Sequence, residues 1–252
     1  MRRQGRRGAG WNALQRGGMA TLVPLQKFRA YGLAAAFLPS MATKNVNDVA
    51  TLPDLSGATL NVSLAQATPS KQPLINGAPT YGGQPSIAGT HANGDMLLVT
   101  SKNPIGATGD ITVISVQRWR DLGPNYYTFM FGASFPNGPV VALGTGLRMW
   151  YPGGCSWGAP STTLAEVWHL RCPRAGTPTL WVNNALQART GGGGAVADPG
   201  GTSTVGIGSV WAGPMGNIDY CFHALFVGTL PPDAVASRMN RGMLAKFAVA
   251  QA

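Results

Sequence analysis

Acidic residues are scarce in this sequence, and glutamate is almost absent. The 252 residues contain nine acidic side chains, Glu166 is the one glutamate, and only 11% of residues are charged. The closely spaced carboxylate pair that most glycosidases use is missing. Asp110 and Asp121 come nearest, but they bracket a predicted strand and should not converge. A helical bundle is excluded as well, because the periodic Glu, Lys and Ala of such folds are missing.

Catalytic and metal-binding patterns are also missing. His91, His169 and His223 lie far apart and show no metal-ligand spacing. The G-x-S-x-G match at Gly154–Gly158 lies in a chain without alternating strands and helices, so it does not indicate a hydrolase. The four glycines at 191–194 lack the Gly-Lys-Ser or Gly-Lys-Thr of a phosphate-binding loop. We expect a protein that is not an enzyme and needs no cofactor, with no support for a calcium site.

Long apolar runs are absent, and cysteine is rare. No stretch approaches the roughly 18 apolar residues of a transmembrane helix. The run Gly32–Leu38 imitates the apolar region of a signal peptide, but it is short and begins some thirty residues into the chain. The three cysteines, Cys155, Cys172 and Cys221, form no C-x-x-C pair and predict buried thiols in a reducing compartment. One Cys155–Cys172 disulfide stays open as an alternative.

Glycine and proline are abundant, at 35 and 19 residues, while 44% of the chain is hydrophobic. Together these features predict strands joined by turns. Turn residues recur about every ten positions, which is the spacing of a sandwich or barrel. The expected strands are Tyr31–Leu38, Asp95–Ser101, Asp110–Trp119, Asn125–Ser134, Pro139–Thr145, Leu147–Tyr151, Leu164–Cys172, Thr179–Asn183, Thr204–Ser209 and Asn217–Gly228.

The end of the chain has a helical pattern. Two prolines and Asp233 open a segment in which Val235, Met239 and Met243 share one face. The pattern predicts one amphipathic helix over 232–248 that caps the β structure. Because neither an internal repeat nor a linker is visible, we expect one domain over 31–252, preceded by an arm.

The first 30 residues form a basic, glycine-rich arm. They carry seven bases and no acid, whereas residues 31–252 hold 12 bases and nine acids. Such an arm suits contact with nucleic acid or another acidic surface. Met1 and Met19 are alternative starts of the chain. The residues expected to dock the arm are Arg2, Arg3, Arg6, Arg7, Trp11, Leu14 and Arg16.

Tryptophan occurs seven times, and the position of each ring relative to the predicted strands suggests its role. Trp119, Trp168 and Trp181 lie inside strand patterns and are predicted to be core residues. Other aromatic residues lie beside loops rich in glycine and proline, where an exposed ring could contact a glycan or a partner, although burial under the loop is the commoner outcome. The candidates of this kind are Tyr151, Trp157 and Trp211.

Three stretches, taken in order, resemble the laminin-G-like type of concanavalin A-like jelly roll. They are Leu52–Gly57 (LPDLSG), Val167–Leu170 (VWHL) followed by Thr179–Asn184 (TLWVNN), and Ile207–Ser209 followed by Gly216–Tyr220, Leu225–Phe226 and the final helix. Asn184 departs from the glycine usual in the family, and Asp219 from the usual strand residue. The resemblance implies an all-β antiparallel β-sandwich whose loops at one rim can bind glycan or protein. It does not imply catalysis.

Laminin-G-like domains with a short extension and low charge resemble those of bacteriophage virion proteins. The leading hypothesis is therefore a non-enzymatic virion structural protein, such as a capsid decoration, fibre or tail component, made in the host cytoplasm. Its jelly roll would be displayed on the particle as a homo-oligomer, and its arm would dock onto other virion proteins. The alternatives are a viral coat protein whose arm binds nucleic acid, and a lectin that binds a host surface glycan. No membrane contact is expected.

Overall fold

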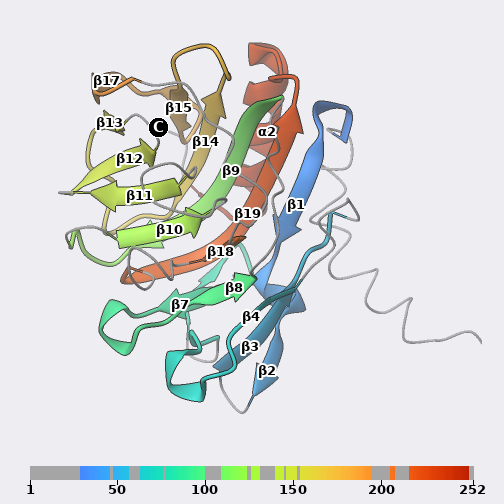
Figure 1. The fold of residues 1–252 in the computed structure, drawn as a ribbon, viewed down its shortest axis with the longest axis vertical. Helices are drawn as coiled ribbons and strands as arrows, with labels where there is room; N and C mark the ends of the chain where they lie inside the picture. The colour runs from blue at the N-terminus through green and yellow to red at the C-terminus, as the bar shows by residue number, and fades with distance from the viewer. Residues whose placement is uncertain are drawn as a thin grey trace, which may run out of the picture.

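The computed structural model describes most of the folded part of the chain, which is an antiparallel β-sandwich with one long helix (Figure 1). None of the helices in this part is long and apolar enough to cross a bilayer. The described residues are 29–45, 48–56, 63–75, 78–99, 109–123, 126–130, 140–144, 146–151, 154–193, 205–207 and 216–249.

The first sheet has seven strands and lies in the centre of the molecule. Its strand order is β1-β19-β9-β14-β15-β16, and β7 pairs with β19 beyond the end of β1. The strands β9 and β19 form its middle and pair from Asp110↔Gly228 to Trp119↔Ile218. The bounds are β1 Leu33–Phe37, β7 Ile87–Gly89, β9 Asp110–Trp119, β14 Glu166–Cys172, β15 Thr179–Val182, β16 Ala185–Leu186 and β19 Ile218–Gly228.

The second sheet has ten strands, in the order β17-β13-β12-β11-β10-β18-β8-β4-β3-β2. The predicted hairpin of β10 and β11 is confirmed, although its turn lies outside the described residues. The bounds are β2 Thr43–Asn45, β3 Asp48–Pro53, β4 Ser63–Ala65, β8 Leu97–Val99, β10 Tyr126–Met130, β11 Val140–Gly144, β12 Leu147–Tyr151, β13 Cys155–Trp157, β17 Arg189–Gly191 and β18 Val205–Ile207. A separate hairpin pairs β5 (Thr80–Tyr81) with β6 (Gln84–Pro85).

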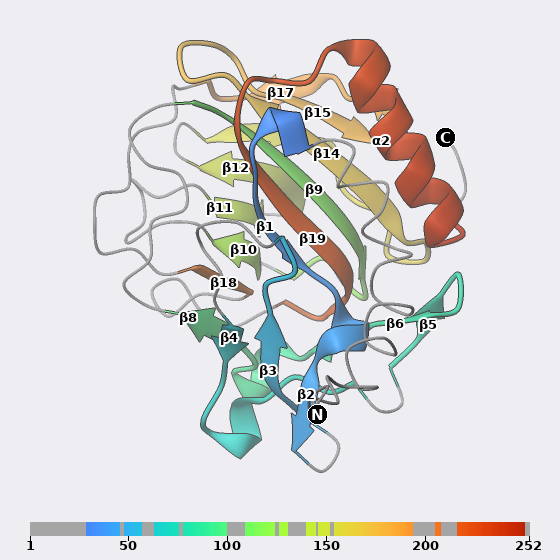
Figure 2. The ribbon, with the colours of Figure 1, turned by 90° about the vertical axis from the view of Figure 1, so that its right-hand side faces the viewer.

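The molecule has three layers, because the helix α2 (Asp233–Lys246) covers the outer face of the central sheet (Figure 2). The inner face of that sheet packs against the ten-stranded sheet through side chains such as Val113 and Trp168. The outer face packs against α2 through Ile114 and Phe222, among others. Both faces of β9 are therefore buried, which explains why its sequence is apolar at most positions instead of at every second one.

The predicted sandwich and its final helix are confirmed. Trp119 and Trp168 are core residues as expected, whereas Trp181 is only half-buried because it lies on the outer face of β15, beside α2. The run Gly32–Leu38 contributes the buried strand β1. All three cysteines are buried and unpaired, so the alternative disulfide is not formed.

Candidate functional site

Polar side chains gather at one end of the central sheet. Gln117, near the end of β9, pairs with Glu166, the first residue of β14, so β9 ends where β14 begins. The strand β19 also begins at this end, because its first residue, Ile218, pairs with Trp119. The strand β7 ends at the same level, since Gly89 pairs with Ile218. We call this end the rim. It comprises residues 89–95, 118–123, 158–166, 183–187 and 216–219.

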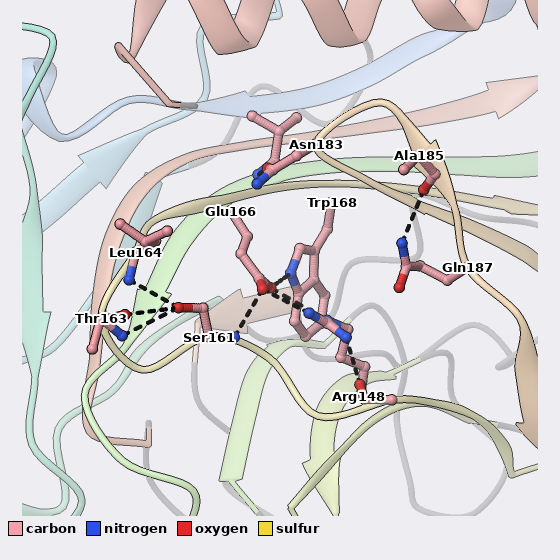
Figure 3. Close-up of polar contacts among 11 residues, drawn as sticks. Arg148, Ser161, Thr163, Leu164, Glu166, Trp168, Asn183, Ala185 and Gln187 are labelled. Atoms are coloured by element: carbon pink, nitrogen blue, oxygen red, sulfur yellow. Dashed lines mark hydrogen bonds and ion pairs between the residues drawn. The ribbon is translucent and has the colours of Figure 1, made fainter. Parts of the chain in front are cut away.

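The carboxylate of Glu166 is the centre of one half of the rim (Figure 3). It joins the two sheets through a double contact with Arg148 of β12, at 2.6 Å from Nη2 and 3.2 Å from Nε. The indole N–H of Trp168 donates to it at 2.6 Å. The guanidinium of Arg148 also lies over the Trp168 ring, 5.5 Å from its centroid. A buried ion pair persists only when its geometry is good and its other hydrogen bonds are made, and both conditions hold here.

This ion pair also fixes the loop before β14. The backbone N–H of Ser161 donates to Glu166 at 2.8 Å, while Arg148 donates to the carbonyl of Gly158 at 2.5 Å. Ser161 Oγ accepts the backbone N–H groups of Thr163 and Leu164 (Figure 3). The loop is thus held from inside, and the side chains of Thr163 and Leu164 face solvent, Leu164 being 59% exposed.

The turn between β15 and β16 lies next to this loop. Asn183 and Asn184 have φ angles of 50° and 69°, which a two-residue hairpin turn of this hand requires. Asparagine tolerates this conformation better than other non-glycine residues. The departure at Asn184 from the usual glycine therefore leaves the turn intact. Asn183 also accepts the backbone N–H of Val167 at 2.8 Å and so ties the turn to β14.

The other half of the rim is built on the buried carboxylate of Asp219. Arg118 contacts it at 2.8 Å and Arg120 at 3.5 Å. The hydroxyl of Tyr81, from the β5–β6 hairpin, donates to it at 2.9 Å. Burial, together with the Asp219 charge, raises the pKa of Tyr81, so the hydroxyl keeps its proton and remains a donor. Arg120 also donates to the carbonyl of Gly89.

Further side-chain bonds join this half to the neighbouring strands. The amide of Asn217 donates to Asp121 at 2.6 Å and accepts the backbone N–H of His91 at 3.0 Å. Asp95 is buried and accepts the N–H of Thr90 at 2.7 Å, and burial raises the pKa of Asp95 to about 6. Asp110 lies at the opposite end of β9 from Asp121, so these two carboxylates do not converge, as predicted.

The predicted contact residues fall mostly elsewhere. Of the two outcomes considered for Trp157, burial is the one observed, so the residue is not an exposed contact: it is 2% exposed and packs in the core between the sheets. Tyr151 lies in β12, but its side chain is outside the described part. The remaining candidates are also outside it: Arg2, Arg3, Arg6, Arg7, Trp11, Leu14, Arg16 and Trp211.

The G-x-S-x-G match is part of a strand. Ser156 lies in β13, where its hydroxyl is 3.1 Å from that of Thr190. His223 is fully buried in β19 of the other sheet. Within the described residues there is no group of three His, Cys, Asp or Glu side chains that could hold a metal ion.

Sequence reasoning missed the anchoring roles of Glu166 and Asp219. A usable signal was present, because each is a charged residue inside an apolar strand and such a residue requires a partner. The partner of Glu166, however, comes from the other sheet, and only the tertiary structure identifies it. What the rim offers a ligand is a set of hydroxyl, amide and guanidinium groups on loops that are held in place.

Comparison with known proteins rests on structure. No family model matches the chain, and no curated protein matches it in sequence. The binding domain of Paraclostridial Mosquitocidal Protein 1 is similar, with a TM-score of 0.58 and 12% identity over 84% of this chain and 52% of that one. The ligand binding domain of botulinum neurotoxin serotype D, solved in complex with N-acetylneuraminic acid, gives a TM-score of 0.55 and 12% identity over 85% and 52%.

A GH54 α-L-arabinofuranosidase is similar as well, with a TM-score of 0.62 and 10% identity over 89% of this chain and 65% of that one. The chain therefore spans between half and two thirds of the length of these three structures. None of the three is described as a virion protein. At this level of identity the likeness concerns the fold, and the chain has a concanavalin A-like antiparallel β-sandwich fold.

Proposed function

We propose that the chain is a non-enzymatic carbohydrate-binding module that binds glycan at the rim. The observation that carries the proposal is the fold shared with a toxin domain solved in complex with N-acetylneuraminic acid. The candidate site is the half of the rim around Glu166, where Thr163 and Gln187 are accessible.

The fixed loops support this proposal. A ligand that binds a surface held in one conformation loses less free energy to the ordering of that surface. Four hydrogen bonds hold the backbone of loop 158–165 to Glu166, Arg148 and Ser161. Small-molecule sites use a few polar groups to orient the ligand beside apolar surface. Here the hydroxyl of Thr163 and the amide of Gln187 would be the polar groups, and Leu164 supplies apolar surface.

Binding of the full chain to a glycan array, followed by calorimetry with the strongest ligands, tests the proposal. We expect Thr163→Ala with Gln187→Ala to weaken binding roughly thirtyfold, because each loses a polar contact of about 1 kcal/mol. Arg238→Ala, on the exposed face of α2, is the matched control and should leave binding unchanged. Absence of binding to every glycan would refute the function, and release of cleaved sugar would refute its non-enzymatic character.

A virion role is the second proposal, favoured by the basic arm with its seven bases and no acid. A displayed glycan-binding module and a docking arm are compatible within one virion protein. We would measure the mass and the 260/280 nm absorbance ratio of the full chain at low and high salt, and repeat this with the five arginines of residues 2–16 changed to Gln. Particles or nucleic acid bound by the unaltered protein alone support the coat role. Small oligomers without nucleic acid in both proteins contradict that role, and loss of particle binding in the altered protein then tests the docking role of the arm.

A further inference from the structure

The fold buries acids and leaves bases exposed. Of the eight acidic residues in the described part of the chain, Asp233 alone is exposed, and it is ion-paired with Arg171 at 2.6 Å. The other seven are buried or half-buried. Basic residues in the same part show the opposite distribution. Those exposed are Arg29, Lys44, Lys71, Arg120, Arg189, Arg238 and Arg241.

Because of this distribution, the net charge of residues 31–252 understates the positive charge at their surface. Residues 31–252 carry only three more bases than acids, which suggests a nearly neutral domain. Charges at the surface determine the field that an approaching ligand meets, however, and a surface of one sign raises the local concentration of ions of the other sign. The part of residues 31–252 that the structure describes therefore presents a cationic surface even without the arm.

Two partly exposed cations lie together at the Asp219 half of the rim, and a third contacts a segment of the same half. Arg118 and Arg120 converge on the Asp219 carboxylate, and their side chains are 27% and 34% exposed. The aliphatic part of the Lys71 side chain lies against Gly94. Its Cε is 3.8 Å from the position that a Cβ atom would have at Gly94. Arg120 and Lys71 thus contact the two ends of the segment 89–95.

The acids of this region lie beneath the cations. Asp219 is fully buried and Asp95 is 1% exposed. Asp121 is half-buried and accepts hydrogen bonds from Gly123 and Asn217. Two guanidinium groups share the Asp219 carboxylate, with Arg118 at 2.8 Å and Arg120 at 3.5 Å, so two positive charges lie over one buried negative charge.

From this arrangement we infer that the rim selects anionic glycans, that Arg118 and Arg120 form the subsite for their carboxylate or sulfate group, and that Lys71 adds positive charge along segment 89–95. Guanidinium groups suit this task, because charge-assisted hydrogen bonds to an oxyanion are about twice as strong as neutral ones. The inference rests on the proposed glycan-binding function and names the chemical class of the ligand.

Calorimetry of the full chain at low salt with lactose, 3′-sialyllactose and 3′-sulfated lactose tests this inference. We expect the two charged ligands, or one of them, to bind at least tenfold more tightly than lactose, and the ligand preferred identifies the anion. The double variant Lys71→Gln with Arg120→Gln should lose most of that preference. The control Arg238→Gln with Arg241→Gln removes the same charge from α2 and should keep it, and Arg120→Lys should retain more of the preference than Arg120→Gln.

The outcomes separate the inference from the proposed function. Equal affinity for all three ligands leaves glycan binding intact and overturns the anion subsite. An equal loss in both double variants also overturns it, because the preference then depends on overall charge. Binding to none of the three ligands nor to any array glycan overturns the function itself. Thermal unfolding of each variant shows whether Arg120→Gln, which removes the bond to Gly89, still folds.

Discussion

At the scale of single residues, the buried ion pair of Glu166 and Arg148 is the strongest constraint on the rim. We expect Glu166→Gln to lower the free energy of unfolding by roughly 3 kcal/mol, because Arg148 would stay buried without its counter-charge. Urea denaturation followed by fluorescence measures the change. Asp233→Asn is the control, since its exposed pair with Arg171 should contribute less than about 1 kcal/mol. Similar losses in the two variants would contradict the anchoring role.

For Asp95 we expect the reverse of the result for Glu166: removal of its charge should raise the free energy of unfolding. Its pKa is raised to about 6 by burial, above the value near 3.9 expected in the unfolded chain. Between about pH 4 and pH 6 the folded state therefore holds the proton more tightly, and stability falls as the pH rises. Asp95→Asn keeps an acceptor for Thr90 and removes the buried charge.

We expect Asp95→Asn to raise the free energy of unfolding by about 1–2 kcal/mol at pH 7 and to change it little at pH 4. Chemical denaturation at the two pH values measures the difference. An equal gain at both values would show that the charge of Asp95 is not the cause.

At the scale of secondary structure, the packing of α2 on β14 depends on a neutral histidine. His169 is fully buried, and its Nδ1 lies 2.7 Å from Asn240 Oδ1 of α2. Burial lowers the pKa of His169 to about 4, and the nearby Arg171 acts in the same direction. Trp181 faces the ring from β15, with their centroids 5.8 Å apart.

Because the folded pKa lies below the usual 6.5, the unfolded chain binds a proton first as the pH falls, and stability is lost between about pH 6.5 and pH 4. We expect His169 to account for a loss of about 2 kcal/mol between pH 7 and pH 5. His169→Gln cannot titrate and should flatten this dependence in urea titrations. An unchanged slope would assign acid sensitivity to other groups, such as the buried His223, whose pKa burial also lowers.

Individual elements differed in how far the sequence predicted them. The strands Asp110–Trp119 and Leu147–Tyr151 were predicted with the bounds observed, and α2 to within two residues at each end. The short strands β2–β7 were missed, although the motif Leu52–Gly57 overlaps the end of β3. These strands have between two and six residues and are interrupted by proline and glycine, so their pairing depends on neighbouring strands more than on a local pattern.

At the scale of the whole molecule, the surface should behave as more cationic than the composition implies. Replacing the five arginines of residues 2–16 by Gln lowers the net charge from +10 to +5. We expect this full-length variant still to bind a cation exchanger at pH 7 and to elute only at raised salt, because the remaining exposed charges are nearly all basic. Elution in the flow-through would show that the arm alone carries the cationic character.

The sequence alone determined the β-rich class, the long central strands, the final helix and the resemblance to a concanavalin A-like sandwich. These features follow from local pattern: alternation, turn residues and helical spacing act within a few positions. The sequence could not place Trp157, because a strand pattern does not say which of two sheets covers a ring.

The tertiary structure decided the rim. Arg148 reaches Glu166 across the sandwich, and Tyr81 reaches Asp219 over 138 residues. Such contacts arise from the order and register of the strands. Burial then determined which charges face solvent, because desolvation drove the carboxylates to partners inside the fold while the long basic side chains kept their charged ends in water.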